Sequence, residues 1–356
     1  MKFIHTADIH MDSKIEILPT EKSKIRREEV VRAFERLADY ATENGVTAVI
    51  IAGDMFDTAR VTLKTRGKII QAISKNSGVD FLYLSGNHDE DNFIDKIEDL
   101  PENLKIFKDE WTSFRYGDVV ISGIKLIGTN FKMASDSLNL NKSDVNIVTM
   151  HGQTYFYEKN AENIALGALK DKNIDYLALG HVHAYSEGSI DQRGKYAYSG
   201  SLEGRGFDET GERGFVLLDV EDRKVKTEFV KFSTREFYEH EYNIEGESDW
   251  YAVREEIIDT LTNKYPQQSI LRLMLVGGRT TDFDIDKINL ELRLNEKFFF
   301  AKVYDKTEIK VNLEDYAADK SVRGEFVRAV CSSDLSDEMK GKVIMCGLNA
   351  LKGEEI

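Results

Sequence analysis

An uninterrupted apolar run, Ala48-Val-Ile-Ile-Ala52, is followed directly by Gly53 and Asp54. Such a run, without polar alternation, predicts a strand that is buried on both faces in the middle of a parallel sheet. Gly53 lets the chain turn sharply, so Asp54 stands just beyond the carboxyl end of the strand, where open α/β sheets bind their ligands. We expect Asp54 to bridge two metal ions, with other polar groups converging on it.

Polar side chains follow other predicted strands in the same way. The strands are expected at Lys2–Ala7, Phe81–Leu84, Asn146–Met150 and Tyr176–Leu179. The residues that follow them are Asp8 and His10; Asn87, His88 and Asp89; His151; and His181 and His183. One histidine at a strand end is often a packed core residue, as we expect for His5, but this whole set indicates a single site.

The donor types in this set indicate the metal. Carboxylate oxygen, amide oxygen and imidazole nitrogen, with no thiolate, suit manganese, iron or zinc. Two such ions about 3.5–4 Å apart can share a carboxylate and activate a water molecule for in-line attack on phosphorus. The sequence therefore predicts a site for two divalent ions such as Mn²⁺, Fe²⁺ or Zn²⁺.

The order of predicted elements favours an α/β fold. Apolar residues recur at helical spacing from Val30 to Ala41, and a second helix is expected at about 63–74. Strand, helix, strand in this order predicts a right-handed crossover within a parallel sheet. The segments Tyr196–Ser201 and Gly214–Val220 alternate like antiparallel strands that would close the sheet.

A chain of 356 residues is expected to form more than one domain. We predict a catalytic domain at 1–238, a smaller α+β domain at 239–315 and a helical C-terminal tail at 316–356. In the second domain, Ile270–Val276, Ile288–Leu294 and Phe298–Val303 are predicted as strands. The apolar face of the tail is expected to dock on a partner or on the second domain; it contains Val343, Ile344, Leu348 and Leu351.

The net charge of −15 argues against a protein that coats nucleic acid through a general basic surface, although it leaves room for a local basic groove. The sequence has no apolar run that could span a bilayer, no signal-peptide core and only two cysteines, so we expect a cytoplasmic protein. Several cations near the motif loops are candidates for phosphate contacts, or else surface residues: Lys64, Arg66, Arg193, Lys195 and Arg205.

Five motifs in fixed order carry a family resemblance. They are D-x-H at Asp8, G-D-x-F-D at Gly53, G-N-H-D at Gly86, H-G at His151 and G-H-x-H at Gly180. This set resembles the calcineurin-like metallophosphoesterases. Asp57 in the second motif is similar to the SbcD-type DNA repair exonucleases, and the tail, at 321–328 and 347–353, resembles their YhaO-like branch. The resemblance implies a four-layer metallophosphoesterase sandwich with a smaller α+β capping domain.

The resemblance also implies residue roles. One metal would be held by Asp8, His10, Asp54 and His183, and the other by Asp54, Asn87, His151 and His181. His88 would donate a proton to the leaving oxygen or stabilise the transition state, oriented by Asp89. This chain departs from the family at Ser199, where proline is common, and at Asp12, where a small residue is common.

The implied activity is that of a manganese-dependent DNA exonuclease and endonuclease acting in double-strand break repair. Its substrates would be duplex ends and single strands, its partner an SbcC-like ATPase, and a homodimer is left open. One alternative is a phosphodiesterase or phosphatase acting on a small molecule. Another is a non-catalytic metal-binding scaffold, whose mark would be missing ligands, and no expected ligand is missing here.

Overall fold

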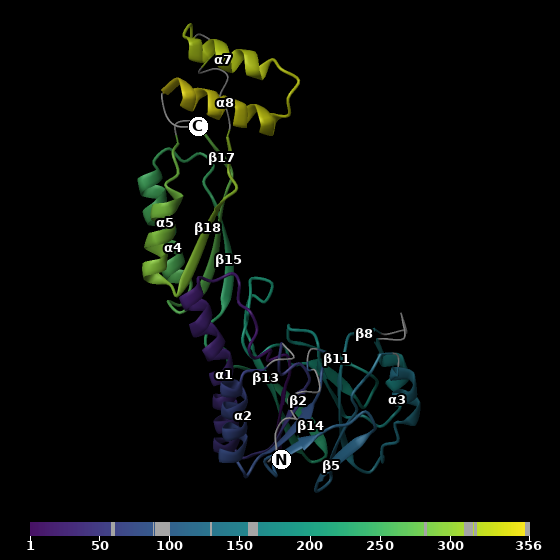
Figure 1. Cartoon of the computed structure of the whole chain (residues 1–356). Coiled ribbons are helices and arrows are strands. Elements are labelled where there is room, and N and C mark those ends of the chain that lie inside the picture. The colour runs from purple at the N-terminus through teal and green to yellow at the C-terminus, as the bar shows by residue number, and fades with distance from the viewer. Residues whose placement is uncertain are drawn as a thin grey trace. The chain divides into compact units, whose positions relative to one another are not determined.

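The structure is a computed structural model, and the residues it describes are 1–57, 61–87, 89, 100–128, 130–155, 163–280, 283–309, 316 and 319–352. The chain forms two compact units, Met1–Glu236 and Phe237–Ile356 (Figure 1). The predicted limits of the catalytic domain, the second domain and the tail as independently folding parts remain predictions.

The first unit contains a six-stranded sheet whose strands lie in the order β14-β13-β1-β2-β3-β4. The strands are β1 (Lys2–Thr6), β2 (Val46–Ala52), β3 (Asp80–Leu84), β4 (Leu104–Ile106), β13 (Gly214–Glu221) and β14 (Lys224–Lys231). Strands β1 to β4 are parallel, and β13 pairs antiparallel with β1, as the alternation of Gly214–Val220 predicted. The apolar run that precedes Gly53 is the buried end of β2.

A second six-stranded sheet has the order β11-β12-β10-β7-β6-β5. Its strands are β5 (Thr112–Tyr116), β6 (Val119–Gly123), β7 (Val145–His151), β10 (Tyr176–Gly180), β11 (Ser186–Ser189) and β12 (Lys195–Tyr198); a short pair is formed by β8 (Thr154–Tyr155) and β9 (Ile164–Ala165). Strand β12 pairs antiparallel with β11 but parallel with β10. The antiparallel pairing predicted for 196–201 is therefore correct on one side only.

Helices cover the outer faces of both sheets. They are α1 (Thr20–Glu43) and α2 (Leu63–Lys75) on the first sheet, and α3 (Phe131–Ser137) with the short 3₁₀ helix η1 (Leu166–Leu169) on the second (Figure 1). Three apolar clusters fill the spaces between helices and first sheet, between the two sheets, and between second sheet and helices. Alternate residues of β2 show the layering, because Val49 faces α1 and Ile50 faces the other sheet. The first unit is thus the predicted α/β sandwich.

The second unit contains a parallel three-stranded sheet in the order β15-β16-β18. Its elements are β15 (Phe237–Asn243), α4 (Trp250–Lys264), β16 (Ile270–Val276), β17 (Gly278–Arg279), α5 (Lys287–Lys297), β18 (Phe300–Asp305), β19 (Glu308–Ile309), α7 (Val322–Cys331) and α8 (Asp337–Lys352). Buried residues of α4, α5 and the sheet share one apolar core. The prediction of a mixed helix and strand composition here is correct.

One predicted strand in this unit is wrong. Apolar residues at every second position made 288–294 resemble a strand, but these residues lie in α5. Asp286 caps this helix by accepting a hydrogen bond from the Asn289 amide at 2.9 Å. Only Leu290 and Leu294, four residues apart, are buried, whereas Ile288 and Leu292 are exposed. The sequence pattern is compatible with a strand or a helix, and packing of Leu290 and Leu294 in the core favours the helix.

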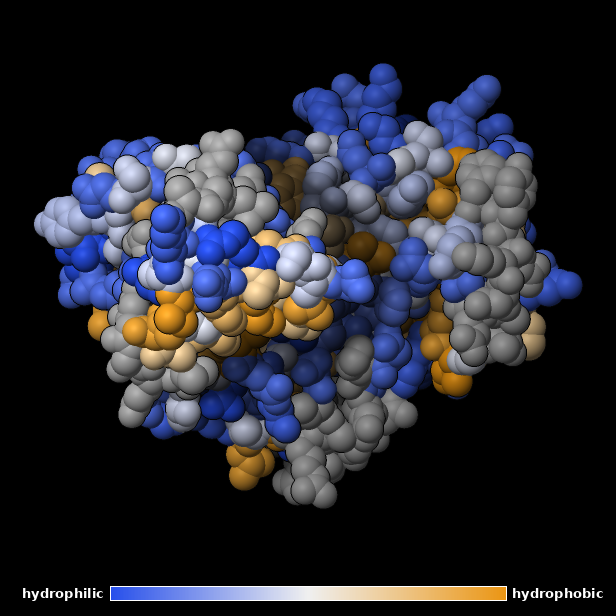
Figure 2. All heavy atoms as spheres, turned by 90° about the horizontal axis from the view of Figure 1, so that it is seen from above, coloured by the Kyte–Doolittle hydropathy of each residue, from blue (hydrophilic) through white to orange (hydrophobic). Residues whose placement is uncertain are grey.

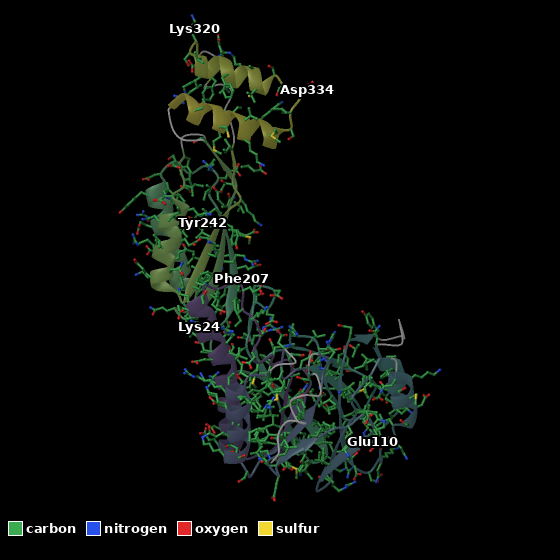
Figure 3. All side chains as sticks on the ribbon, in the orientation of Figure 1. Lys24, Glu110, Phe207, Tyr242, Lys320 and Asp334 are labelled. Carbon is green, nitrogen blue, oxygen red and sulfur yellow. The ribbon has the colours of Figure 1, made fainter. Side chains whose placement is uncertain are left out.

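The C-terminal helices pack on each other. Ile344 and Leu348 of α8 lie in a small apolar cluster with Val327 and Val330 of α7. Lys320 and Asp334 flank α7 at its two ends (Figure 3). The apolar face of the tail was expected to dock elsewhere, but Ile344 and Leu348, and in part Val343, are already covered within this cluster.

The face of the molecule seen in Figure 2 is mostly hydrophilic, and its hydrophobic atoms form small separate patches. Within the described part of the chain, no helix combines the length and the hydropathy that crossing a membrane requires.

Candidate metal centre

The segments that follow β1 and β2 run side by side beyond the sheet. The amide of Asp8 donates to the carbonyl oxygen of Gly53 at 3.1 Å, and that of His10 to Asp54 at 3.0 Å. The second sheet joins at the same edge, since the amide of His181 donates to both carboxylate oxygens of Asp8 at 2.9 and 3.0 Å. The segments that follow β1, β2 and β10, from both sheets, are thereby brought together.

The backbone at this edge is unusual. Asp8, His10, Asp54 and His181 have positive φ angles of 51°, 50°, 52° and 103°. For residues other than glycine such angles cost of order 1–3 kcal/mol each, and they cluster at functional sites. Tertiary contacts therefore hold these four side chains in orientations that a relaxed loop would not adopt.

Asp8, His10 and His183 form a first group whose potential ligand atoms lie within 4.8 Å of one another. The Nε2 atoms of the two histidines are 3.1 Å apart. Asp8 and His10 are almost fully buried, and His183 is partly exposed. One carboxylate and two imidazoles thus face a common point.

Asp54, His151 and His181 form a second such group. The amide oxygen of Asn87 lies 2.9 Å from Nε2 of His151 and 3.3 Å from Nδ1 of His181. The other ring nitrogen of His151 lies 2.9 Å from the carbonyl oxygen of Ala52, which favours a proton on Nδ1 and a free lone pair on Nε2. The group therefore offers oxygen and nitrogen lone pairs to one position.

Asp54 lies between the two groups. One of its carboxylate oxygens is 3.2 Å from Nε2 of His151 and 3.9 Å from Nε2 of His10. It is the acidic residue expected from the sequence to bridge two ions, and its place beside histidines of both groups is compatible with that role.

Outer carboxylates orient two of the histidines. Oε1 of Glu209 lies 2.6 Å from Nδ1 of His183, and Oδ1 of Asp57 lies 3.1 Å from Nδ1 of His10. The guanidinium of Arg205 bonds both carboxylates, at 3.0 Å to Glu209 and 3.3 Å to Asp57. Carboxylate–histidine pairs of this kind fix the tautomer of a metal ligand and raise its basicity.

Burial and neighbouring charge shift the pKa values of the inner residues. Burial raises the pKa of Asp8 to about 6, against the opposing effect of His151 and His183. Burial would lower the pKa of His151, but the hydrogen bond and charge of Asp54 outweigh it and raise the pKa to about 8. Protons and metal ions therefore compete for the same lone pairs.

The outer carboxylates are held in their charged form. The hydrogen bond with His10 lowers the pKa of Asp57 to about 2, against its partial burial. Burial opposes ionisation of Glu209, but the hydrogen bond with His183 and the charge of Arg205 lower its pKa to about 2. The same bond raises the pKa of His183.

Glycines allow the inner residues to approach one another. A Cβ atom on Gly86 would lie 2.1 Å from Oδ1 of Asp54, and one on Gly53 would lie 2.2 Å from Nδ1 of His151. Gly53 also has a φ of 94°. The close packing of Asp54 and His151 thus depends on the absence of side chains at these positions.

Asp89 is buried beside the centre. Its carboxylate accepts hydrogen bonds from the amides of Phe56, Gly86 and Met55 at 2.9, 3.0 and 3.2 Å. It thereby joins the loops that follow β2 and β3. His88 lies outside the described residues, so its predicted role and its orientation by Asp89 stay predictions.

Several functional contacts were missed or misassigned. The pattern of strand ends did not single out Glu209. The only local signal for this residue is its place four positions after Arg205 in a glycine-rich stretch. Arg193, a candidate phosphate contact, instead bonds Asp175 at 2.7 Å. Arg205 belongs to the outer contacts of the metal centre.

The donor set fits divalent metal ions. Each group combines carboxylate oxygen with imidazole nitrogen, as borderline ions such as manganese, iron and zinc prefer. A bound cation would stabilise the close approach of the two Nε2 atoms in the first group. The residues present are therefore sufficient for two ions.

Comparisons with known proteins agree with this chemistry. The family model for calcineurin-like phosphoesterases matches residues 1–185. The chain is 24% identical over 372 residues to the uncharacterized metallophosphoesterase YhaO of Bacillus subtilis, covering 96% of this chain and 90% of that protein. It is 22% identical over 381 residues to the DNA double-strand break repair protein Mre11 of Saccharolobus solfataricus, covering 100% and 96%.

The corresponding Mre11 of Methanosarcina acetivorans is 25% identical over 333 residues, which cover 89% of this chain but 52% of that protein. Among solved structures, TT1561 of Thermus thermophilus superposes with a TM-score of 0.43 at 13% identity, covering 64% of this chain and 98% of the other.

Proposed function

This chain belongs to the calcineurin-like phosphoesterase family, whose members use two divalent metal ions, and we propose that it is a DNA nuclease of that family. We assign one ion to Asp8, His10, Asp54 and His183 and the other to Asp54, Asn87, His151 and His181. Both ligand sets combine the oxygen and nitrogen donors that lie together at the strand ends.

Two ions held there would polarise the phosphoryl oxygens and lower the pKa of a water molecule. The protein's own residues supply orientation: Glu209 and Asp57 hold the His183 and His10 rings, and Asp89 joins the loops that carry Asp54 and Asn87. We assign to His88 the proton that the leaving oxygen needs, a contribution of about 10²–10⁴ in rate.

The observation that best supports DNA as the substrate is the extent of the similarity to Mre11. It spans all of this chain and 96% of the Saccharolobus solfataricus protein, which is named for double-strand break repair, and so it includes the second unit. A likeness confined to the metal centre would support only a phosphoesterase, because many substrates share that chemistry.

We further propose that manganese is the native metal, with iron or zinc as alternatives, and that an SbcC-like ATPase is the partner. The contact would involve the C-terminal helices, on which several large apolar side chains remain exposed. The most exposed of these are Val322, Met339 and Leu351. Since Ile344 and Leu348 pack on α7, the partner would meet these outer residues instead.

The test compares three substrates with the metal-free protein reloaded with Mn²⁺: labelled duplex DNA, single-stranded DNA and a small chromogenic phosphodiester. We expect manganese-dependent degradation of both DNAs, faster when the ATPase partner is present. The matched control is Asp54→Asn, which should abolish cleavage of every substrate.

Turnover of the small ester with no cleavage of either DNA, even with the partner, would replace the nuclease by a small-molecule phosphodiesterase. Binding of both ions without turnover of any substrate would favour the non-catalytic scaffold.

A further inference from the structure

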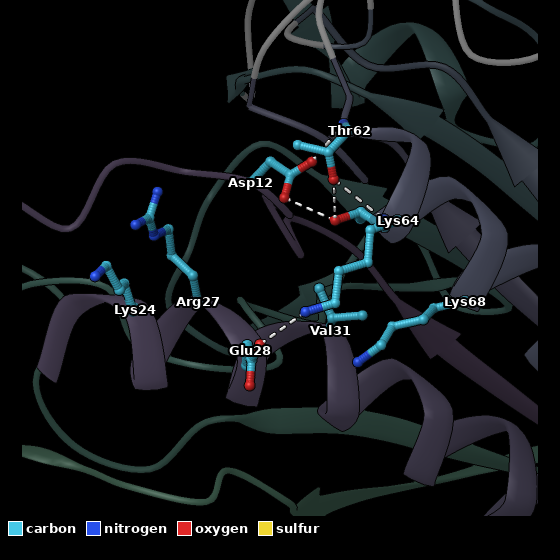
Figure 4. Close-up of a pocket in the computed structure, with 9 residues that line it drawn as sticks. Asp12, Lys24, Arg27, Glu28, Val31, Thr62, Lys64 and Lys68 are labelled. Carbon is cyan, nitrogen blue, oxygen red and sulfur yellow. Dashed lines mark hydrogen bonds and ion pairs between the residues drawn. The ribbon is translucent and has the colours of Figure 1, made fainter. Parts of the chain in front are cut away.

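A cavity of about 240 Å³ lies between α1 and α2 in the first unit, apart from the ligands of the metal centre (Figure 4). Four of the residues that line it are cationic and two are acidic: Lys24, Arg27, Lys64 and Lys68, with Asp12 and Glu28. The local excess of positive charge contrasts with a net charge of −15 for the whole chain.

The cations come from facing helical surfaces. Lys24 and Arg27 are three residues apart on α1, and Lys64 and Lys68 are four apart on α2, so each pair lies on one side of its helix. Figure 4 shows these side chains around the same space. Two helices that pack together thus present basic groups to one cavity.

The two acids are already engaged. The carboxylate of Asp12 accepts hydrogen bonds from the amide of Thr62 and the hydroxyl of Thr65, each at 2.8 Å. Glu28 pairs with Lys64 at 2.9 Å. Within the described part of the chain, Arg27 and Lys68 have no ion pair of their own. Two half-buried cations therefore remain to meet an anion.

The lining also indicates the kind of anion. Val31 is its one apolar member, and none of the residues that line the cavity is aromatic, so nothing there could stack on a base. Arginine and lysine side chains suit phosphate oxygens. A backbone phosphate fits this environment better than a nucleotide bound through its base.

We propose that this cavity is a subsite for a backbone phosphate of DNA, outside the phosphate that is hydrolysed. The inference rests on the proposed nuclease function. Asp12 belongs to the segment that carries Asp8 and His10, and it shares their positive φ, at 60°. The cavity and the metal centre thus adjoin opposite ends of one short loop, so a single strand of substrate would be recognised at both.

The experiment uses the full chain with Arg27→Ala and Lys68→Ala combined. Binding of labelled duplex DNA is measured against salt concentration, with EDTA present to prevent cleavage. Each phosphate contact contributes about −0.9 to the slope of log affinity against log salt. We expect the slope to become shallower by about 1–2, with unchanged turnover of a small chromogenic phosphodiester in Mn²⁺.

The matched control combines Lys132→Ala with Lys142→Ala, two exposed lysines that do not line the cavity. It makes the same change in net charge and should leave the slope as in the wild type. Equal losses in the two double variants would replace the subsite by a general effect of charge. An unchanged slope in the Arg27/Lys68 variant would overturn the proposal.

Competition separates two sources of phosphate. If inorganic phosphate or a nucleoside monophosphate binds to the wild type and not to the variant, while the DNA slope is unchanged, the cavity serves free phosphate and the DNA assignment is overturned. DNA binding that depends on the cavity in EDTA, with no cleavage when Mn²⁺ is supplied, would support the subsite and contradict only the nuclease function. Absence of DNA binding by the wild type at low salt would contradict both.

Discussion

The Nε2 atoms of His10 and His183 lie 3.1 Å apart, although 173 positions separate the two residues in the sequence. Each ring directs its Nδ1 atom at a carboxylate, of Asp57 and of Glu209, which favours a proton on that nitrogen. When both rings are neutral, each Nε2 atom then carries a lone pair that a cation can bind. Such a pair of rings can bind a cation between them, and without one a protonated ring can donate a hydrogen bond to the other.

Glu209→Gln should weaken the binding of one metal ion only, the ion assigned to His183. The neutral amide of glutamine no longer offers Nδ1 of His183 a charged acceptor. Removing such outer contacts typically costs about 10–100-fold in affinity. Calorimetric titration of the metal-free protein with Mn²⁺ should show one weakened and one nearly unchanged binding event. Asp175→Asn breaks an ion pair with Arg193 in the same unit and should change neither. Equal weakening of both events by Glu209→Gln would contradict the pairing with His183.

Asp54→Asn should weaken both binding events, because its carboxylate lies beside histidines of both groups. We expect a loss greater than about 10²-fold, beyond the usual effect of an outer contact. His151→Ala, which removes a ligand of one group only, is the comparison. Metal content per chain after dialysis checks the result, and retention of two ions by Asp54→Asn would rule out a bridging role.

His88→Ala should retain both ions and lose about 10²–10⁴-fold in the rate of phosphodiester hydrolysis, since general acid catalysis has that magnitude. The loss of rate should be smaller for an ester whose leaving group is a stronger acid and therefore depends less on a proton donor. Measured turnover of two esters with different leaving groups, together with metal content, tests this. A variant that loses a metal ion would show that His88 is a ligand instead.

Gly86→Ala should disrupt the centre, because the added methyl group would lie 2.1 Å from Oδ1 and 2.5 Å from the backbone nitrogen of Asp54. Overpacking of this kind costs about 1–3 kcal/mol of stability. Gly67→Ala is the control: it lies within α2, has no atom within 4 Å of the added Cβ, and should stabilise by about 0.5–1 kcal/mol. Chemical unfolding and Mn²⁺ titration of both variants measure the contrast.

His5 makes stability depend on pH. The ring is buried, with Nδ1 2.9 Å from the Tyr176 hydroxyl and Nε2 3.1 Å from the Leu179 carbonyl oxygen. Burial lowers its pKa from 6.5 to about 3, so between these values the unfolded chain binds a proton that the folded chain does not. The free energy of unfolding therefore falls as pH drops through this window, by up to about 1.4 kcal/mol per pH unit.

His5→Asn should remove that contribution to the slope, although it lowers stability at neutral pH. Tyr176→Phe removes a hydrogen-bond partner but keeps the imidazole, so its slope should match the wild type. Urea unfolding of the metal-free proteins at several pH values between 3.5 and 7 provides the comparison. Identical slopes for wild type and His5→Asn would show that His5 is not the titrating group.

The inner residues of the centre could be predicted because their positions follow from local patterns. A buried strand such as β2 is visible as an apolar run, and the residue just beyond it must lie at the edge of the sheet. His151 is the last residue of β7 and His181 is the first residue after β10, so both lie at the same edge. The parallel arrangement then brings these separate strand ends together without any knowledge of the loops.

The outer contacts could not be predicted in this way, because they depend on the path of a loop. Glu209 meets His183 only through the turn at 204–211, which has no periodic pattern to read. Arg193 shows the same difficulty, since a cation near a motif can face substrate or a neighbouring carboxylate with equal ease. For 288–294 the alternation was compatible with strand or helix, and only packing against the core of the second unit decides between them.

The proposed ligands come from both sheets, so ions bound to them would link the two sheets of the first unit. Asp8, His10, Asp54 and Asn87 precede β7, whereas all three histidines at 151, 181 and 183 belong to β7 or follow it. A chain cut in the loop before β7 would leave neither fragment with a full set. Ions that bind only the joined state stabilise it by mass action, so metal supply would set how firmly the two sheets stay together and how readily severed halves reassemble.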